Sequence, residues 1–462
     1  MEKYRDIMIG GASLQVAKER YGIFTAITMI VGICIGSGIF FKSDNILVAT
    51  GGSVFLGVLV FALGALAIIF GGLCLSQLAS RTDKAGGVIT YYEEFGSKRL
   101  ACAFGWFQTF IYYPTITAVV SWVVGIYVCI LFNLPSSFTL QLLIGISFCS
   151  LCFIYNTLSP KFGGAVQNVS TVIKLIPLFL IGILGFIYGN PVAGLSNVSI
   201  DTLAGTAWIA AVGPIAFSYD GWVVSTSVAH EVKNSKRNMP LALIIAPLFI
   251  FAIYVLYFVG VTSYIGVDKV MELEDAHVAL AASQLFGDFG AKAIIIFVTI
   301  SVMGTVNGLV LGFIRLPFLL ALRGNVLPFA KALRVENKNL GMPVNAAIFA
   351  FAMTMLWTLL HYFTINFELL PNSDVSEISI AMSYLMYTIL YYKVFDLYRK
   401  GEVKSVVMGV VVPLLATLGS AFILWGGMQN ALFLYYAAFC LLLFAAAFVY
   451  FNINQKQGKE TV

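Results

Sequence analysis

Long apolar stretches recur along almost the whole of this 462-residue chain, and they limit what it can fold into. An α-helix rises about 1.5 Å per residue, so about 20 apolar residues span the hydrocarbon core of a lipid bilayer. The chain is 60% hydrophobic and only 11% charged, whereas soluble domains carry about 25% charged residues. The sequence therefore predicts an all-α integral membrane protein.

Twelve apolar stretches lie between clusters of charged and turn-forming residues, and they predict twelve transmembrane helices. They are residues 22–50, 54–79, 101–131, 138–158, 164–189, 204–231, 241–265, 290–322, 343–362, 378–397, 405–425 and 430–452. Residues 1–20 lack the apolar core and cleavage site of a signal peptide. We expect them to form a short interfacial helix.

Lys and Arg residues collect on one side of the predicted helices. With the N-terminus inside, the inner segments hold 22 of the 27 basic residues and the outer segments hold three. Basic residues are enriched in the cytoplasmic loops of membrane proteins. We therefore expect a multi-pass protein of the cell inner (plasma) membrane, with both the N- and C-termini cytoplasmic.

Cysteines and histidines give no indication of a bound cofactor. The seven cysteines all lie in apolar stretches, and this odd, buried set argues against a disulfide framework. Cys149 and Cys152 have the spacing of a redox motif but no polar neighbours. The three histidines lie in separate regions without metal-ligand spacing, so we expect neither a metal site nor a cofactor.

Two of the predicted helices contain residues that interrupt a helix in mid-membrane. The first stretch contains Gly36-Ser37-Gly38, and the sixth contains Gly213-Pro214 followed by Ser218-Tyr219-Asp220-Gly221. Glycines also permit close packing in membrane helices, so one such site alone would carry little weight. Interruptions in the first and sixth helices correspond if helices one to five and six to ten form inverted repeats, an arrangement that places a substrate site near the midplane.

The backbone N–H and C=O groups freed at such interruptions indicate which ligand could bind there. Inside the bilayer they cannot form hydrogen bonds with bulk water, so they must line a cavity or bind a ligand. The N–H groups of Ser37 and Gly38, next to Gly36, suit a carboxylate. The carbonyls of Cys34 and of the adjacent Phe217 and Ser218 suit an ammonium group. An α-amino acid carries both groups on one carbon and is the predicted substrate.

Four segments resemble the amino acid–polyamine–organocation (APC) superfamily, and within it the L-amino acid transporter (LAT) family and its bacterial alanine–serine–cysteine and serine–threonine exchangers. The segments are GICIGSGIF (32–40), SQLASRTDKAGGVITYYEEFG (76–96), AFSYDGW (216–222) with HEVKNSKRNMP (230–240), and GTVNGLVLGFIRLPFLLALRGNVLP (304–328). The resemblance implies a LeuT-type 5+5 inverted repeat with discontinuous helices 1 and 6. The expected divisions are a cytoplasmic segment 1–20, a first repeat 21–190, an inverted second repeat 200–400, helices 11 and 12 at 405–452, and a cytoplasmic tail 453–462.

The resemblance also implies roles for individual residues around the substrate. It implies the same backbone groups for carboxylate and amine binding, and Phe217 resembles an aromatic gate beside Tyr219. Tyr254 aligns with a tyrosine that is tied to closure over the substrate. We further expect Gly304 and Asn307 to line the pocket.

Several other side chains are expected near the pathway. Tyr113, with the following proline, is expected to shape the side-chain end of the pocket. Asp220 is expected to cap the second half of the sixth helix, with direct ligation as the alternative. Glu231 and Arg315 are expected to form an inner gate or a structural pair.

Lys174 is a charged residue far inside a predicted helix. It follows Lys161 by 13 residues, roughly 20 Å along a helix, and an ionisable residue at that depth indicates a function. The matching lysine of the family occupies the ion position of sodium-coupled relatives. We therefore expect sodium-independent transport, with Lys174 bonded to carbonyls near Gly32 and to a group on the eighth helix.

The predicted function is the exchange of small neutral L-amino acids (Ala, Ser, Cys or Thr) by alternating access. Proton-coupled symport on the same fold is the alternative, because Lys174 could titrate. An enzyme is not expected, since no catalytic constellation is present, and no P-loop indicates an ATP-driven pump. The expected partners are the amino acid and the lipid bilayer, without nucleic acid. Animal relatives pair covalently with a glycoprotein through a cysteine after the third helix, but the loop FNLPSS (132–137) has none.

Overall fold

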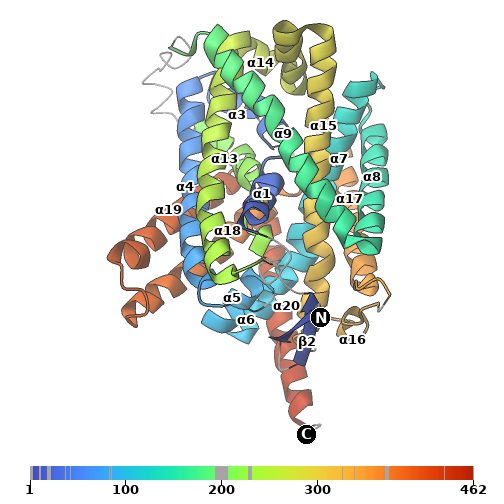
Figure 1. The fold of residues 1–462 in the computed structure, drawn as a ribbon, viewed down its shortest axis with the longest axis vertical. Coiled ribbons are helices and arrows are strands. Elements are labelled where there is room, and N and C mark those ends of the chain that lie inside the picture. The colour runs from blue at the N-terminus through green and yellow to red at the C-terminus, as the bar shows by residue number, and fades with distance from the viewer. Residues whose placement is uncertain are drawn as a thin grey trace.

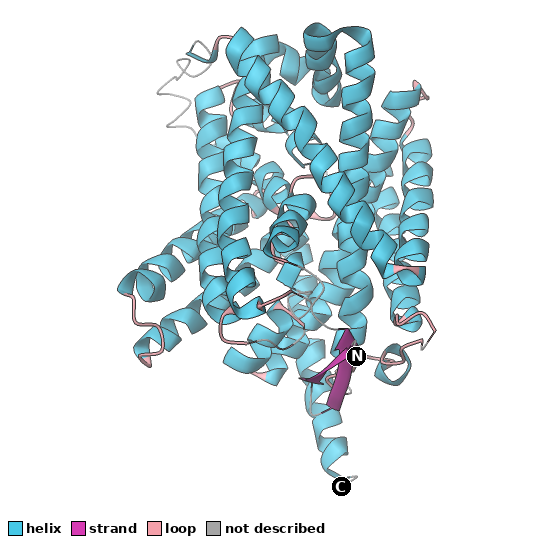
Figure 2. Ribbon diagram, in the orientation of Figure 1, coloured by secondary structure: helices cyan, strands magenta, loops and turns pink. Residues whose placement is uncertain are grey.

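The protein is a bundle of long helices (Figures 1 and 2), in agreement with the helical membrane fold predicted from the sequence. The computed structural model describes residues 4–9, 12–17, 22–36, 38–41, 43–82, 84, 86–192, 207–226, 232–324, 326–337, 339–369, 374–430 and 432–460. Ten of the helical segments in this described part of the chain are long and apolar enough to cross a membrane.

The first half of the described chain contains these elements: β1 Tyr4–Ile9, β2 Ala12–Ala17, α1 Ile23–Cys34, α2 Gly38–Phe41, α3 Ser43–Ala49, α4 Val54–Ala79, α5 Val88–Phe95, α6 Lys98–Phe107, η1 Gln108–Tyr112, α7 Tyr113–Phe132, α8 Phe138–Leu158 and α9 Pro160–Tyr188.

The second half contains η2 Ala207–Ala211, α12 Val212–Tyr219, α13 Ser235–Ile265, α14 Val267–Leu273, η4 Glu274–Ala276, α15 His277–Ala321, α16 Ala330–Leu333, α17 Val344–Asn366, α18 Glu377–Arg399, η5 Val407–Val411, α19 Val412–Gly427 and α20 Phe433–Glu460.

Two of the twelve predicted helices are not among the ten membrane-length apolar segments. In the sixth stretch, α12 has only eight residues and ends at Tyr219. The tenth corresponds to α18, a 23-residue helix that includes Lys393, Asp396 and Arg399. These charges lower its mean hydropathy, although its length of roughly 35 Å would cross the hydrocarbon core.

The interfacial helix expected at the N-terminus is wrong. β1 and β2 form an antiparallel hairpin in which Ile9 pairs with Ala12 and Tyr4 with Ala17 (Figure 2). The sequence between the strands is Gly10-Gly11. Glycine pairs favour two-residue hairpin turns because those turns require positive φ angles, and this local preference outweighs the helical interpretation.

The eighth predicted helix begins earlier than expected. α15 starts at His277 rather than near residue 290, and its path is kinked at Gly287, where φ is +69°. Only glycine adopts such a conformation at little cost. The predicted stretch therefore corresponds to the part of α15 that follows the kink.

The helix that carries the first interruption lies at the centre of the bundle. α1 packs against α13, α9 and α15, and Figure 1 shows it surrounded by longer helices. Its residues from Met29 to Cys34 are all buried. Outer helices such as α8 and α17 instead expose large apolar side chains, including Leu151 and Leu359. This distribution shields the interruption from lipid.

Candidate functional site

The interruption expected in the first helix is present. α1 ends at Cys34, Ile35 is extended with φ −75° and ψ 90°, and α2 begins at Gly38. Ser37 lies outside the described residues. Glycine is needed at Gly38 because a Cβ there would lie 2.5 Å from the Cα of Ser218. The two interrupted segments therefore approach each other closely at their backbones.

The second interruption lies directly opposite the first. α12 ends at Tyr219, Asp220 is extended with φ −72° and ψ 163°, and Gly221 has φ +91°. A side chain at Gly221 would also meet Ile33 of α1, since its Cβ would lie 2.5 Å from a methyl carbon of that residue. Steric and conformational requirements thus agree on glycine at this position.

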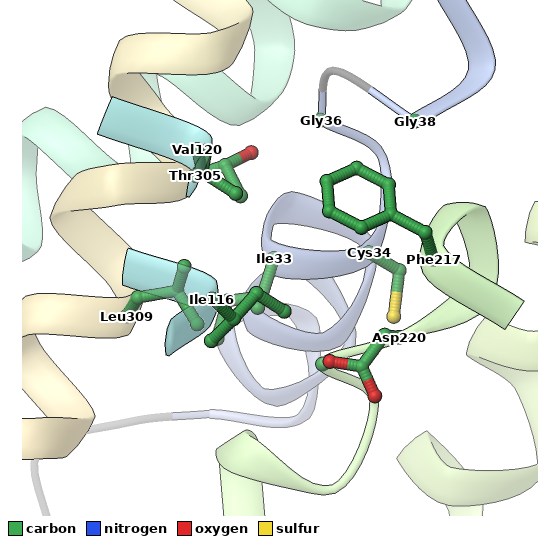
Figure 3. A pocket seen from close by; sticks show the side chains of 11 residues that line it. Ile33, Cys34, Gly36, Gly38, Ile116, Val120, Phe217, Asp220, Thr305 and Leu309 are labelled. Carbon is green, nitrogen blue, oxygen red and sulfur yellow. The ribbon is translucent and has the colours of Figure 1, made fainter. Parts of the chain in front are cut away.

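A small cavity lies between the two interruptions (Figure 3). Five residues singled out from the sequence line it: Cys34, Gly36, Gly38, Phe217 and Asp220. The remaining lining residues come from the same segments and from α7 and α15, and they are Ile33, Ile116, Val120, Gly221, Thr305 and Leu309. Figure 3 shows how the labelled side chains converge from these elements.

Tyr254 of α13 connects the two interrupted helices behind the cavity. Its hydroxyl lies 2.9 Å from the carbonyl oxygen of Cys34 and 2.7 Å from that of Ser218. Tyr219 stacks on the Tyr254 ring and donates to the carbonyl of Phe61 at 3.1 Å. Neither tyrosine lines the cavity. In this structure, the carbonyls expected to receive an ammonium group contact a hydroxyl.

Lys174 has the contacts expected from the sequence. Its Nζ donates to the carbonyls of Gly32 at 2.5 Å and Ile35 at 2.6 Å, and to the Thr305 hydroxyl of α15 at 3.3 Å. The side chain is fully buried. An ammonium group has three donors, and all three have an acceptor here. Lys174 therefore ties α9 to α15 and to the end of α1.

Asp220 is a buried carboxylate on the cavity wall. It accepts the Tyr112 hydroxyl at 2.5 Å and the N–H of Gly221. Its exposed fraction is 5%. Asp220 begins the turn at 220–223 that follows α12. The capping of the second half of the sixth helix stays a prediction, because residues 227–231 lie outside the described residues. The contact with Tyr112 joins Asp220 to the π-helical turn before α7.

Gly304 and Asn307 lie on other faces of α15 than the cavity. The missing side chain of Gly304 leaves room for Ser170 of α9. The Asn307 amide donates to the Gly163 carbonyl and to Gln167 Oε1, both at 3.0 Å. Thr305, one residue from Gly304 in the sequence, faces the cavity instead. The expectation that Gly304 and Asn307 line this pocket is therefore corrected.

Two other expected residues, Tyr113 and Arg315, lie away from the central cavity. Tyr113 stacks on Phe313, with ring centroids 5.3 Å apart, and borders a separate cavity. Glu231 lies outside the described residues. Arg315 donates to the Leu311 carbonyl of its own helix at 2.9 Å. The described ion pair at this end of α15 joins Arg323 to Glu93, at 2.8 Å.

The residues missed by sequence reasoning are mostly apolar. Ile116, Val120 and Leu309 differ in no visible way from the other apolar residues of their helices. Thr305 could have been found, because it is a polar residue two positions from Asn307 in a largely apolar stretch.

Comparison with known proteins identifies the family of this chain. A family model described as amino acid permease matches residues 21–462. The chain belongs to the amino acid permease family. Its LAT-type relatives place this permease in the APC superfamily, as the sequence motifs indicated.

The similar proteins are amino acid transporters, and the similarity extends over most of their length. This permease is 32% identical to the serine/threonine exchanger SteT of Bacillus subtilis, covering 88% of this chain and 90% of that protein. It is 28% identical to the human b(0,+)-type amino acid transporter 1, covering 95% and 90%. It is 26% identical to the human cystine/glutamate transporter, covering 84% and 76%. The chain is therefore a multi-pass membrane protein of amino acid transport.

Proposed function

We propose that this permease is a sodium-independent exchanger of small neutral L-amino acids that works by alternating access. The observation that carries the proposal is the cavity between the two interrupted helices, where the ends of α1 and α12 converge and the carbonyls of Cys34 and Ser218 are held by the Tyr254 hydroxyl. In a bilayer such groups need a partner that water does not supply. A zwitterion offers a carboxylate to the backbone N–H groups and an ammonium group to the backbone carbonyls.

The proposed recognition assigns one end of the substrate to each set of backbone groups. The N–H groups of Gly36, Ser37 and Gly38 bind the carboxylate. The carbonyls of Cys34, Phe217 and Ser218 bind the ammonium group, which displaces the Tyr254 hydroxyl from two of them. Exchange of one donor for another keeps these carbonyls paired throughout.

The rest of the cavity wall accounts for small neutral side chains. Ile116, Val120 and Leu309 are apolar, while Thr305 offers one hydroxyl. A methyl or hydroxymethyl side chain would meet partners on this wall. The relative SteT is named for serine and threonine, which have side chains of this size and polarity.

Sodium independence rests on Lys174. Its ammonium group occupies the position between the α1 carbonyls and α15. A fixed positive charge repels a second cation at the same position, since two unit charges about 4 Å apart interact by several kcal/mol where water is scarce. Substrate binding would then proceed without an ion.

We further propose the LeuT-type arrangement of twelve helices. In it, η2, α12 and the segment that follows form the sixth helix, and α18 forms the tenth. The first repeat is 21–190, the inverted second repeat is 200–400, and helices 11 and 12 cover 405–452. Residues 1–20 and 453–462 would be cytoplasmic, in the plasma membrane, and no covalent glycoprotein partner is expected.

Transport by the purified protein tests the proposal. Proteoliposomes preloaded with unlabelled serine should take up labelled serine or alanine faster than empty vesicles, equally in sodium and in choline buffer. A competition panel of the common amino acids should show the strongest inhibition by alanine, serine, cysteine and threonine. Loss of uptake without sodium, or indifference to all amino acids, would refute it.

Proton-coupled symport is the second candidate, and Asp220 is the observation that favours it. A buried carboxyl group on the cavity wall could carry a proton with the substrate. Symport predicts that an inward proton gradient drives uptake into empty vesicles. Exchange predicts that internal substrate accelerates uptake with no gradient.

A further inference from the structure

A second cavity lies next to the central one, on the side of α5 and α6. This cavity is small, and Phe104, Tyr112, Tyr113 and Tyr387 contribute its aromatic wall. Figure 1 shows α5 and α6 at the end of the molecule where α20 terminates. The charge distribution predicts this end to be cytoplasmic. The second cavity is called the inner cavity below.

One hydrogen-bonded pair links the walls of the two cavities. Tyr112 lines the inner cavity and Asp220 lines the central cavity, and they are joined by the 2.5 Å bond from the tyrosine hydroxyl. The residues that follow Asp220 border both cavities, since Gly221 lines the central cavity and Val223 lines the inner one. The two cavities therefore share a wall at this segment.

Gln108 lines the inner cavity and carries an amide nitrogen without a hydrogen-bond partner in the described part of the chain. Its side chain is 94% buried, since its exposed fraction is 6%. Within the described residues, its Nε2 has no hydrogen-bond partner. Buried polar groups in native proteins are nearly always paired, so an exception needs an explanation. A ligand acceptor in the inner cavity would supply one.

The local backbone explains why Gln108 has this position. Residues Gln108–Tyr112 form a π-helical turn, a feature that occurs often at functional sites. Pro114 follows and has no N–H to donate to the carbonyl of Phe110. That carbonyl accepts the indole N–H of Trp357 at 2.6 Å instead. The wide turn is thereby held in place from α17.

Two other polar side chains at the inner cavity are already paired. The Thr226 hydroxyl donates to the Val223 carbonyl at 2.7 Å and accepts the N–H of Val88 at 3.3 Å. The Tyr112 hydroxyl donates to Asp220. The described lining contains no charged side chain. The lining thus combines the Gln108 amide donor with four aromatic side chains.

We infer that the inner cavity is a second amino-acid-binding site, occupied as the substrate passes between the central cavity and the cytoplasmic side. Gln108 donates to the substrate carboxylate, and the aromatic faces of the wall attract its ammonium group by cation–π interaction. This inference rests on the proposed transport of amino acids. It adds a site that would be reached from one face of the membrane only.

Side-specific kinetics of Gln108→Leu test the inference. Leucine keeps the size of the side chain but removes the donor. In inside-out membrane vesicles, where the cytoplasmic face is outside, we expect the half-saturating serine concentration to rise about tenfold. In right-side-out vesicles we expect a change of less than about twofold. Gln108→Glu, which places a charge opposite the carboxylate, should raise the cytoplasmic value further.

Thr109→Val is the matched control. Thr109 is equally buried and its hydroxyl also has no partner among the described residues, but it does not line the inner cavity. It should leave both half-saturating concentrations unchanged. Equal effects of Gln108→Leu on both faces, or none on either, would overturn the inner site while transport itself stands. Absence of serine transport by the wild type from both faces would instead overturn the proposed function.

Discussion

Replacement of Lys174 by methionine tests the central electrostatic feature of this permease. Methionine has a similar length and no charge, so the Gly32 and Ile35 carbonyls and the Thr305 hydroxyl lose their donor in a buried region. Each unsatisfied buried acceptor costs about 1–3 kcal/mol, partly offset because the ammonium group no longer has to be desolvated. We expect a net loss of about 2–4 kcal/mol, concentrated where α1 meets α9 and α15.

This loss should appear in both stability and transport. If half of it falls on the conformation that closes over the substrate, exchange at saturating serine slows about five- to thirtyfold, since about 1.4 kcal/mol corresponds to a factor of ten. The assays are serine exchange in proteoliposomes and the melting temperature of the detergent-solubilised protein. Lys161→Met, at the exposed start of the same helix, should change neither. Wild-type exchange and stability of the Lys174→Met protein would refute the reasoning.

Two further predictions follow from close contacts and charge. Gly38→Ala should lower the affinity for serine at least about tenfold in a binding assay, because its Cβ would overlap the backbone of α12. Gly22→Ala is the control and should bind serine as the wild type does, since its Cβ would have no atom within 4 Å. Glu93→Gln should lower the melting temperature by weakening the pair with buried Arg323, worth about 1–2 kcal/mol. Glu94→Gln, whose partner lysine is half-exposed, should not, and equal melting temperatures for the two variants would contradict this.

The helical membrane fold and the positions of its interruptions were predictable because they depend on local composition. Apolar stretches of sufficient length must form helices in a bilayer, since no water is present to pair their backbone groups. Gly36, Gly38 and Pro214 weaken helices wherever they occur. The depth of Lys174 followed from residue counting alone. The N-terminal hairpin is also encoded locally, since Gly10-Gly11 between its strands favours a two-residue turn.

The direction in which each side chain points was decided only by the tertiary structure. A soluble helix shows its buried face through an apolar stripe, but α15 is apolar nearly all round. Its sequence therefore does not predict that Thr305 faces the cavity while Gly304 and Asn307 face α9. The bridge from Tyr254 to two carbonyls and the contact between Tyr112 and Asp220 join residues more than 30 positions apart. Such contacts depend on how the helices pack, because a bilayer makes every face of an apolar helix equally acceptable until a neighbouring helix covers it.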